Sequence, residues 1–141
     1  MKYETDGDLI RLTLDRPEVL NAVNYQGTLD LHRAAQAIHD DPKARVVLIR
    51  GNGRDFCTGI DLKELAAEET PHDYFYQWDH ALRLLELSDK LVVCAIHGYA
   101  LGGGLQLPLA SDIRIATEDA VLGLPAAKEG FIPGLGTHRL P

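Results

Sequence analysis

The 141-residue chain has few cysteines and no long apolar run. Cys57 and Cys94 lack the number and spacing of a disulfide framework or a zinc site, so reduced thiols are expected. No segment approaches the roughly 18 apolar residues of a membrane-spanning helix. The N-terminus also lacks the apolar segment of a secretory signal. These absences predict a cytoplasmic protein with no membrane partner.

Concentrated basic charge is missing as well. The chain has 14 Lys and Arg against 21 Asp and Glu, which gives a net charge of −7. Affinity for a phosphate backbone rests on clustered Lys and Arg, and the sequence concentrates them nowhere. Nucleic acid is therefore not an expected partner.

Several motifs of known chemistry do not occur. Without a GK[ST] sequence there is no phosphate-binding P-loop, and the run Gly51–Phe56 fails the last glycine of a dinucleotide fingerprint. Neither Ser88 nor Ser111 lies in a GxSxG elbow. The six histidines show no metal-ligand spacing such as HExxH. Neither a metal nor a nucleotide cofactor is predicted.

What the chain does have is an alternation of strand and helix patterns. Short apolar or alternating runs predict strands at Leu9–Leu14, Val46–Ile49, Leu91–Ile96 and Asp112–Ala116. The two middle runs are typical of strands covered on both faces. Helical spacing predicts helices at Tyr25–Asp40 and Asp73–Leu87, and a short one at Leu105–Ala110. This order indicates one α/β layered domain with crossover connections.

Two of the predicted strands are followed by glycine-bearing turns. The sequence RGNGRDFCTGIDLKEL follows Ile49, and HGYALGGGLQL follows Ile96. Glycine lets the main chain approach a ligand, and amides at the beginning of a helix are unpaired. Two such amides, one from each turn, would form an oxyanion hole for a thioester enolate. The alternative is that the glycines only allow a helix to pack tightly against a strand.

Four segments make the chain resemble the enoyl-CoA hydratase/isomerase (crotonase) superfamily. They are LDRPEVLNAV at 14–23, FCTGIDLKEL at 56–65, GYALGGGLQLPLASDIRIATEDAVLGLP at 98–125 and GFIPGLGTHRLP at 130–141. The resemblance implies a spiral of β-β-α turns, with residues 1–141 as a crotonase-like core domain. It also implies an acyl-CoA thioester as the ligand. Coenzyme A would then belong to the substrate, and no separate cofactor is expected.

The resemblance also bears on assembly. Family members usually continue into a C-terminal helical region that covers the acyl site and builds trimers or pairs of trimers. This sequence ends at Pro141. The expected fold therefore lacks that region, and the expected partner is either further copies of the chain, as a trimer or hexamer, or a second chain that supplies the missing helices.

Site residues follow from the resemblance position by position. The oxyanion amides would be those of Ile60 and Gly103. Val19 and Leu20 would lie in the loop that receives the adenine and pantetheine parts of coenzyme A. The further positions implied for substrate binding are Thr58, Gly59, Asp61, Leu62, Gly102, Leu124 and Pro125.

Both glutamates that manage water in the family's hydratases are replaced. Gln106 and Ala126 stand at their positions. Glutamine can hold a water molecule but cannot exchange protons near neutral pH, and alanine can do neither. Some relatives carry an aspartate eight residues beyond the second position, where this chain has Gly134.

Other side chains are candidates for the missing base. The segment that often lines the family's acyl pocket contains His72, Asp73, Asp79 and His80, and the alternative for each is a solvated helix position. Lys128 and Glu129 follow the second lost glutamate, and a solvated or ion-paired position is the alternative for both. Cys57 is a possible nucleophile, but a buried thiol is usually inert. His97 is interpreted as a satisfied core histidine, and Asp112 as a support for the glycine loop.

Two functions stay open at this point. The first is an acyl-CoA enzyme of the hydratase/isomerase type that catalyses hydration, isomerisation or cleavage of a carbon–carbon bond. The last of these is the reaction of relatives that hydrolyse β-diketones without either glutamate. The second is a non-catalytic acyl-CoA-binding or assembly module. Turnover of a thioester panel distinguishes them.

Overall fold

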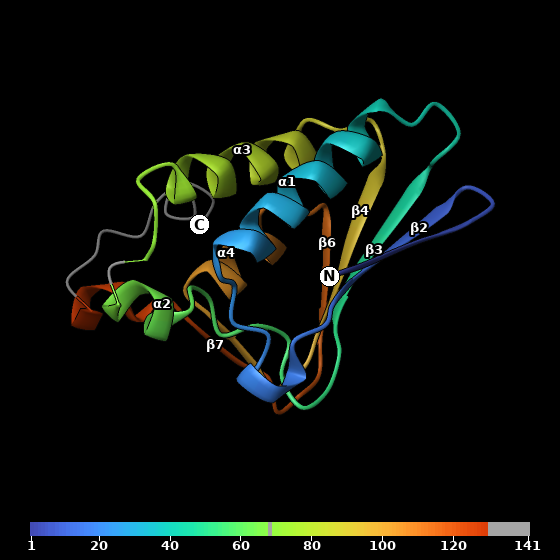
Figure 1. Cartoon of the computed structure of the whole chain (residues 1–141). Helices are drawn as coiled ribbons and strands as arrows, with labels where there is room; N and C mark the ends of the chain where they lie inside the picture. Colours follow the sequence, from blue (N-terminus) through green and yellow to red (C-terminus); the bar gives the residue numbers. More distant parts are fainter. Residues whose placement is uncertain (68, 130–141) are drawn as a thin grey trace.

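A five-stranded sheet organises the computed structural model, which describes residues 1–67 and 69–129 (Figure 1). The strand order is β1-β2-β3-β4-β6; β1 is antiparallel to β2, and the other neighbours are parallel. The strands are β1 Lys2–Asp6, β2 Leu9–Leu14, β3 Val46–Gly51, β4 Leu91–Ile96 and β6 Ile113–Ala116. Parallel neighbours need crossovers, and the chain supplies them as helices.

Two roughly parallel helices, α1 (Tyr25–Asp40) and α3 (Tyr74–Glu86), lie side by side over one face of the sheet (Figure 1). Each buries a stripe at helical spacing; on α1 the stripe includes Leu31, Ala35 and Ile38. Asn24 caps α1, because its side-chain oxygen accepts a hydrogen bond from the Gly27 amide at 2.9 Å. The sequence predicted α1 with its observed bounds and α3 within one residue at each end.

The sheet is buried asymmetrically. Val47, Ile49, Val92 and Cys94 have no exposed surface and face the helices, whereas their neighbours along β3 and β4 are partly or fully exposed. The prediction that both strands are covered on both faces is wrong for the described residues. The alternation of buried and exposed positions was not visible in these apolar runs, because the sheet face away from the helices also carries Val, Leu and Ala.

A second, two-stranded sheet pairs β5 (Tyr99–Leu101) with β7 (Val121–Gly123). Strand β5 follows β4 after a two-residue turn and leads into α4 (Gly103–Leu109). Strand β7 follows β6 and leads into the 3-10 helix η2 (Pro125–Glu129). Two successive β-β-α turns thus carry the chain away from the main sheet, as the resemblance implied. Sequence patterns missed β5 and β7, because three residues are too few to show a period.

The remaining elements are short. The 3-10 helix η1 covers Pro17–Val19, and α2 covers Leu62–Ala66. Helix α4 begins two residues earlier than predicted, inside the glycine triplet, and β6 begins at Ile113 rather than at the predicted Asp112. The segment Gly130–Pro141, with Gly134, lies outside the described residues.

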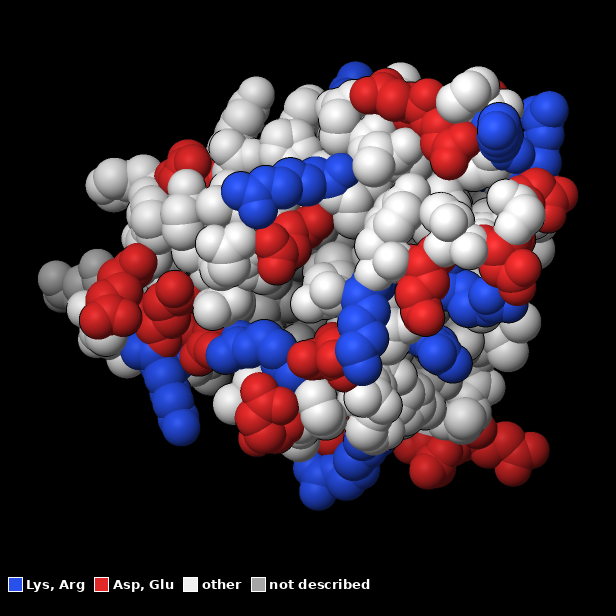
Figure 2. Space-filling view, turned by 45° about the vertical axis from the view of Figure 1, so that its right-hand side comes forward, with Lys and Arg blue, Asp and Glu red and all other residues white. Residues whose placement is uncertain are grey.

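Acidic and basic side chains are interspersed on the face shown in Figure 2. Several are paired across short distances, such as Lys2 with Asp15 at 2.9 Å and Arg11 with Asp6 at 3.0 Å. No helix in the described part of the chain is long and apolar enough to span a bilayer.

Candidate active site

Asn21 fixes the loop after β2. Leu20 and Asn21 both have φ of 55°, a left-handed conformation that asparagine tolerates better than leucine. The buried Asn21 side chain accepts a hydrogen bond from the Arg16 amide at 2.8 Å and donates to the carbonyls of Asn52 and Asp55, each at 2.8 Å. One side chain therefore joins the loop after β2 to the loop after β3.

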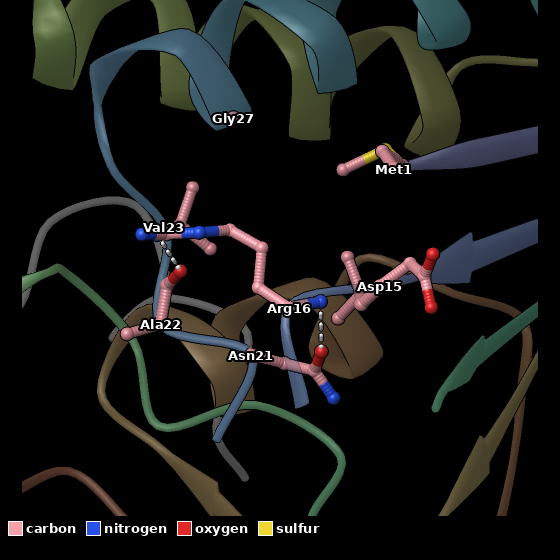
Figure 3. Close-up of a pocket in the computed structure, with 8 residues that line it drawn as sticks. Met1, Asp15, Arg16, Asn21, Ala22, Val23 and Gly27 are labelled. Atoms are coloured by element: carbon pink, nitrogen blue, oxygen red, sulfur yellow. Dashed lines mark hydrogen bonds between the residues drawn. The ribbon is translucent and has the colours of Figure 1, made fainter. Parts of the chain in front are cut away.

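A pocket opens on the same loop (Figure 3). Its lining residues come from the residue before β1, the end of β2, the loop that follows and the first turn of α1, and are Met1, Leu14, Asp15, Arg16, Asn21, Ala22, Val23 and Gly27. Neither Val19 nor Leu20, the residues predicted to bind coenzyme A, belongs to this lining.

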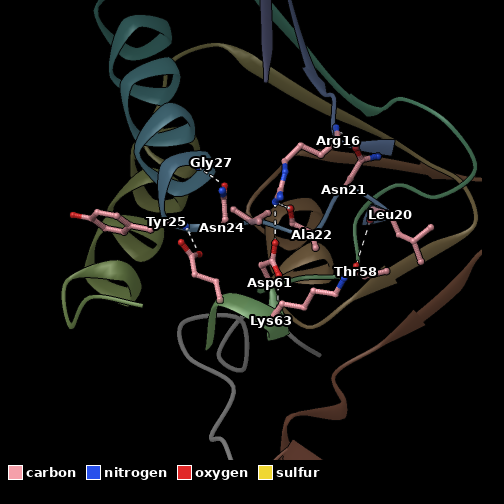
Figure 4. A network of polar contacts seen from close by, with 12 residues as sticks. Arg16, Leu20, Asn21, Ala22, Asn24, Tyr25, Gly27, Thr58, Asp61 and Lys63 are labelled. Carbon is pink, nitrogen blue, oxygen red and sulfur yellow. Dashed lines mark hydrogen bonds and ion pairs between the residues drawn. The ribbon is translucent and has the colours of Figure 1, made fainter. Parts of the chain in front are cut away.

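Arg16 connects the loop after β2 to the glycine-bearing turn after β3 (Figure 4). Its guanidinium donates to the Ala22 carbonyl at 2.7 Å and to the Asp61 carboxylate at 3.1 Å. Asp61 in turn caps α2 by accepting from the Lys63 amide at 3.2 Å, and Glu64 accepts from the Tyr25 amide at 2.7 Å. Sequence reasoning missed Arg16, because nothing in the spacing indicates a partner 45 residues away.

An isolated parallel β-bridge between Val23 and Ile60 sets the direction in which the Ile60 amide points. Val23 uses both of its backbone groups in that bridge, accepting from Asp61 at 2.9 Å and donating to the Gly59 carbonyl at 2.7 Å. In a parallel pairing of this kind the N–H and C=O of the opposite residue point the other way. The Ile60 amide therefore points away from Val23, while Thr58 is held by the Leu20 carbonyl at 3.2 Å.

The two glycine-bearing turns are in backbone contact. Cys57 accepts a hydrogen bond from the Leu101 amide at 3.0 Å and donates to the Tyr99 carbonyl at 2.9 Å. The turns also approach closely at Gly59, where an added Cβ would lie 2.7 Å from the Leu101 carbonyl oxygen and 3.0 Å from the Gly103 nitrogen. The structure thus brings the Thr58–Ile60 segment to Gly103, and the oxyanion role of Ile60 and Gly103 stays a prediction.

Each glycine of the triplet is required for a different structural reason. Gly102 has φ of +54°, a conformation that side chains disfavour. Gly103 faces the indole of Trp78, and an added Cβ would lie 3.3 Å from its Cζ2 atom. Gly104 is packed against the turn that follows β3, with an added Cβ only 2.1 Å from the Cys57 carbonyl oxygen. Tight packing, the alternative considered for these glycines, therefore explains Gly104.

The two positions that the resemblance aligns with the family's glutamates, Gln106 and Ala126, follow this contact in the chain. Gln106 is one helical turn beyond Gly103, and its Oε1 accepts a hydrogen bond from Trp78 Nε1 at 3.1 Å. The Gly102 amide donates to the Gly123 carbonyl at 2.9 Å, so the following residues Leu124, Pro125 and Ala126 lie just beyond the glycine loop. Ala126 is buried and brings no polar group. Leu62 is exposed on α2.

The candidate bases lie in other surroundings. His80 pairs with His32 at 2.8 Å between α3 and α1, and Asp73 accepts a hydrogen bond from the Tyr25 hydroxyl at 2.9 Å. His72 and Lys128 are exposed. Asp79 is half-buried on α3. None of these contacts brings a titratable group to the glycine loop.

Two residues interpreted as structural are placed differently from the prediction. His97 contacts the Gly53 carbonyl at 3.0 Å, but it is partly exposed and is not a core residue. Asp112 accepts from the Val92 amide at 2.8 Å and therefore supports the beginning of β4 rather than the glycine loop. The short side chain reaches β4 because β6 begins at the next residue and pairs with that strand.

Cys57 is unsuited to act as a nucleophile. It is fully buried, and this burial raises the pKa of its thiol to about 12. The thiol donates to the Asn21 carbonyl at 3.2 Å. Near neutral pH it stays protonated, as the interpretation of an inert thiol expected. Within residues 1–67 and 69–129, no group of three or more His, Cys, Asp or Glu side chains is arranged to hold a metal ion.

The family follows from comparison with known proteins. The enoyl-CoA hydratase/isomerase family profile matches residues 4–141, and the chain belongs to this family, within the crotonase superfamily. It is 36% identical over 143 residues to a crotonyl-CoA hydratase of Syntrophomonas wolfei, covering 98% of this chain and 55% of the relative. It is 40% identical over 141 residues to a carnitinyl-CoA dehydratase of Proteus mirabilis, covering 97% and 53%.

Solved structures agree with this assignment. AtuE of Pseudomonas aeruginosa superimposes with a TM-score of 0.89 at 29% identity, over 98% of this chain and 55% of that one. The α/β fold of β-β-α turns is therefore the crotonase fold. The chain spans about half the length of the relatives that it matches.

Because Gly104 lies in close backbone contact, adding a single methyl group there should strongly destabilise the protein. Gly104→Ala forces the Cys57 carbonyl to move, and we expect it to lower the free energy of unfolding by about 3 kcal/mol or more. Gly123→Ala is the matched control, because its added Cβ would only touch the flexible Leu101 side chain at 3.4 Å. Urea denaturation measures both variants. Equal stability of the two would contradict the close approach of the turns.

Proposed function

We propose that this chain binds acyl-CoA thioesters and polarises the thioester carbonyl between the backbone amides of Ile60 and Gly103. The observation that carries the proposal is the backbone contact between the two glycine-bearing turns, which places the Thr58–Ile60 segment at Gly103. Membership of the enoyl-CoA hydratase/isomerase family supports the ligand class. Two amides aimed at one oxygen stabilise the negative charge that develops on an enolate.

The reaction that follows is limited by the groups beside the amides. Neither Gln106 nor Ala126 takes or gives a proton near neutral pH. The Cys57 thiol stays protonated. We therefore propose that ordinary hydratase activity is weak, and that enolate chemistry such as cleavage of a β-dicarbonyl, or binding without turnover, is the function of this site.

The family's assembly is proposed for this chain as well. Four large apolar side chains are exposed on β6 and β7, namely Ile113, Ile115, Val121 and Leu122. Neighbouring strands carry further apolar residues, such as Leu91 and Tyr99, at 44% and 40% exposure. Such a surface favours contact with another polypeptide, and further copies of the chain are the simplest source.

Removing the Gly103 amide should weaken thioester binding. Gly103 is the first residue of α4, where proline is compatible with a helix, so Gly103→Pro deletes the donor without interrupting the helix. We expect calorimetry to show butyryl-CoA bound about three- to tenfold more weakly, with free coenzyme A unaffected because it has no thioester carbonyl. Gly103→Ala keeps the N–H and serves as the control. Unchanged butyryl-CoA affinity in the proline variant would refute the oxyanion assignment.

Restoring the carboxylates should restore hydration. Gln106→Glu with Ala126→Glu is expected to raise the rate on crotonyl-CoA by at least about 100-fold, because each acid or base contributes a factor of about 10² to 10⁴. Ala126→Gln in the wild-type background matches the added volume without a titratable group. A wild-type rate equal to that of the double variant would show that another base acts.

Self-association should be visible in solution. We expect sedimentation at micromolar concentration to give a mass above the 15.5 kDa of one chain. Ile115→Lys should shift the distribution toward the monomer, because it places a charge in the exposed apolar strand. Glu118→Gln, on an exposed turn residue, changes the net charge by the same single unit and is the control. A wild-type chain that stays monomeric would contradict the assembly.

A further inference from the structure

Trp78 and Gln106 form a buried polar pair that the proposed function does not use. The indole Nε1 of Trp78, on α3, donates to Oε1 of Gln106, on α4, at 3.1 Å. The two residues are 5% and 8% exposed. They lie 28 residues apart in the sequence, so only the packing of α3 against the glycine loop brings them together.

The pair fixes which way the Gln106 amide faces. An indole N–H can only donate, so the oxygen of the amide must be the atom that faces Trp78. The NH2 group then faces away from the indole. Among residues 1–67 and 69–129, no protein acceptor is found for it. Gln106 therefore presents a donor, whereas a free glutamine could present either end of its amide.

This donor lies beside the predicted oxyanion amide. Gly103 and Gln106 are three residues apart on α4, and side chains at this spacing share a face at about 5 to 6 Å. The Trp78 indole contacts both positions, since an added Cβ at Gly103 would lie 3.3 and 3.5 Å from its Cζ2 and Cε2 atoms. Two kinds of N–H donor, backbone and side chain, are thus grouped around one indole.

We propose that Trp78 orients Gln106 as a hydrogen-bond donor that selects acyl groups with a carbonyl oxygen on the β carbon, that is, 3-oxoacyl-CoA thioesters. The inference rests on the proposed function, because the thioester oxygen must occupy the amides of Ile60 and Gly103. A second oxygen two carbons away then lies within one helical turn, at the Gln106 NH2 group. A saturated acyl chain offers this donor no acceptor, so it lacks a hydrogen bond that a 3-oxoacyl chain makes and binds more weakly.

The test compares two four-carbon ligands on the full chain. We expect calorimetry to show acetoacetyl-CoA bound about two- to tenfold more tightly than butyryl-CoA, which lacks only the β oxygen. Gln106→Leu should bring the two affinities together. Gln106→Glu should favour butyryl-CoA, because a carboxylate at neutral pH accepts hydrogen bonds and repels a carbonyl oxygen. Gln36→Leu, at an exposed position on α1, should keep the wild-type preference.

Trp78→Phe tests the positioning role of the indole. This variant keeps an aromatic ring against Gly103 but removes the N–H, so the Gln106 amide is free to turn. The preference for acetoacetyl-CoA should fall while butyryl-CoA affinity stays the same, an outcome that a merely structural role of Trp78 does not give. Circular dichroism checks that each variant is folded, and the Gln106 variants test the donor independently of any loss of core packing.

The outcomes separate this inference from the proposed function. If butyryl-CoA and acetoacetyl-CoA bind equally to the wild-type chain, the selection by Gln106 is refuted and thioester binding stands. A preference that survives Gln106→Leu also refutes it, because another group then recognises the β oxygen. If neither thioester binds more tightly than free coenzyme A, both the proposed function and this inference fail.

Discussion

The close contact between two backbone segments is the constraint on which the rest of the site depends. Cys57 exchanges two hydrogen bonds with the strand β5, and Gly104 leaves no room for a side chain against the Cys57 carbonyl. Backbone groups can approach this closely only where side chains are missing. The glycine triplet therefore joins two turns that start from neighbouring strands, and the positions of Ile60 and Gly103 follow from that junction.

Polar side chains hold this junction from the other side. Asn21 satisfies three backbone groups in the loops after β2 and β3, and Arg16 joins the loop after β2 to Asp61, the residue next to Ile60. The Arg16 and Asp61 side chains are 33% and 13% exposed, so their charges are only partly screened by solvent. The amides of the site are thus fixed by contacts on both flanks before any ligand arrives, which is the preorganisation that electrostatic stabilisation requires.

The chemistry near the glycine loop consists of hydrogen-bond donors rather than proton carriers. Gln106 and Trp78 face each other through neutral groups, Ala126 has no polar atom, and burial keeps the Cys57 thiol protonated. Under the proposed function, such a site would stabilise negative charge on oxygen without exchanging a proton itself. The proposal thus assigns to this chain the electrostatic part of the chemistry without the acid–base part.

The local sequence determined the elements with a clear period and the residues of the two turns. Helix α1 and the strands β2 and β4 could be read directly, because each depends on a continuous stretch of chain. Only the tertiary structure decided that Trp78 fixes the Gln106 amide, that Arg16 reaches Asp61 and that His80 turns to His32 instead of the glycine loop. These contacts join residues 28 to 48 positions apart, and a side chain's partner at that separation is set by how the helices and loops pack, which no local pattern encodes.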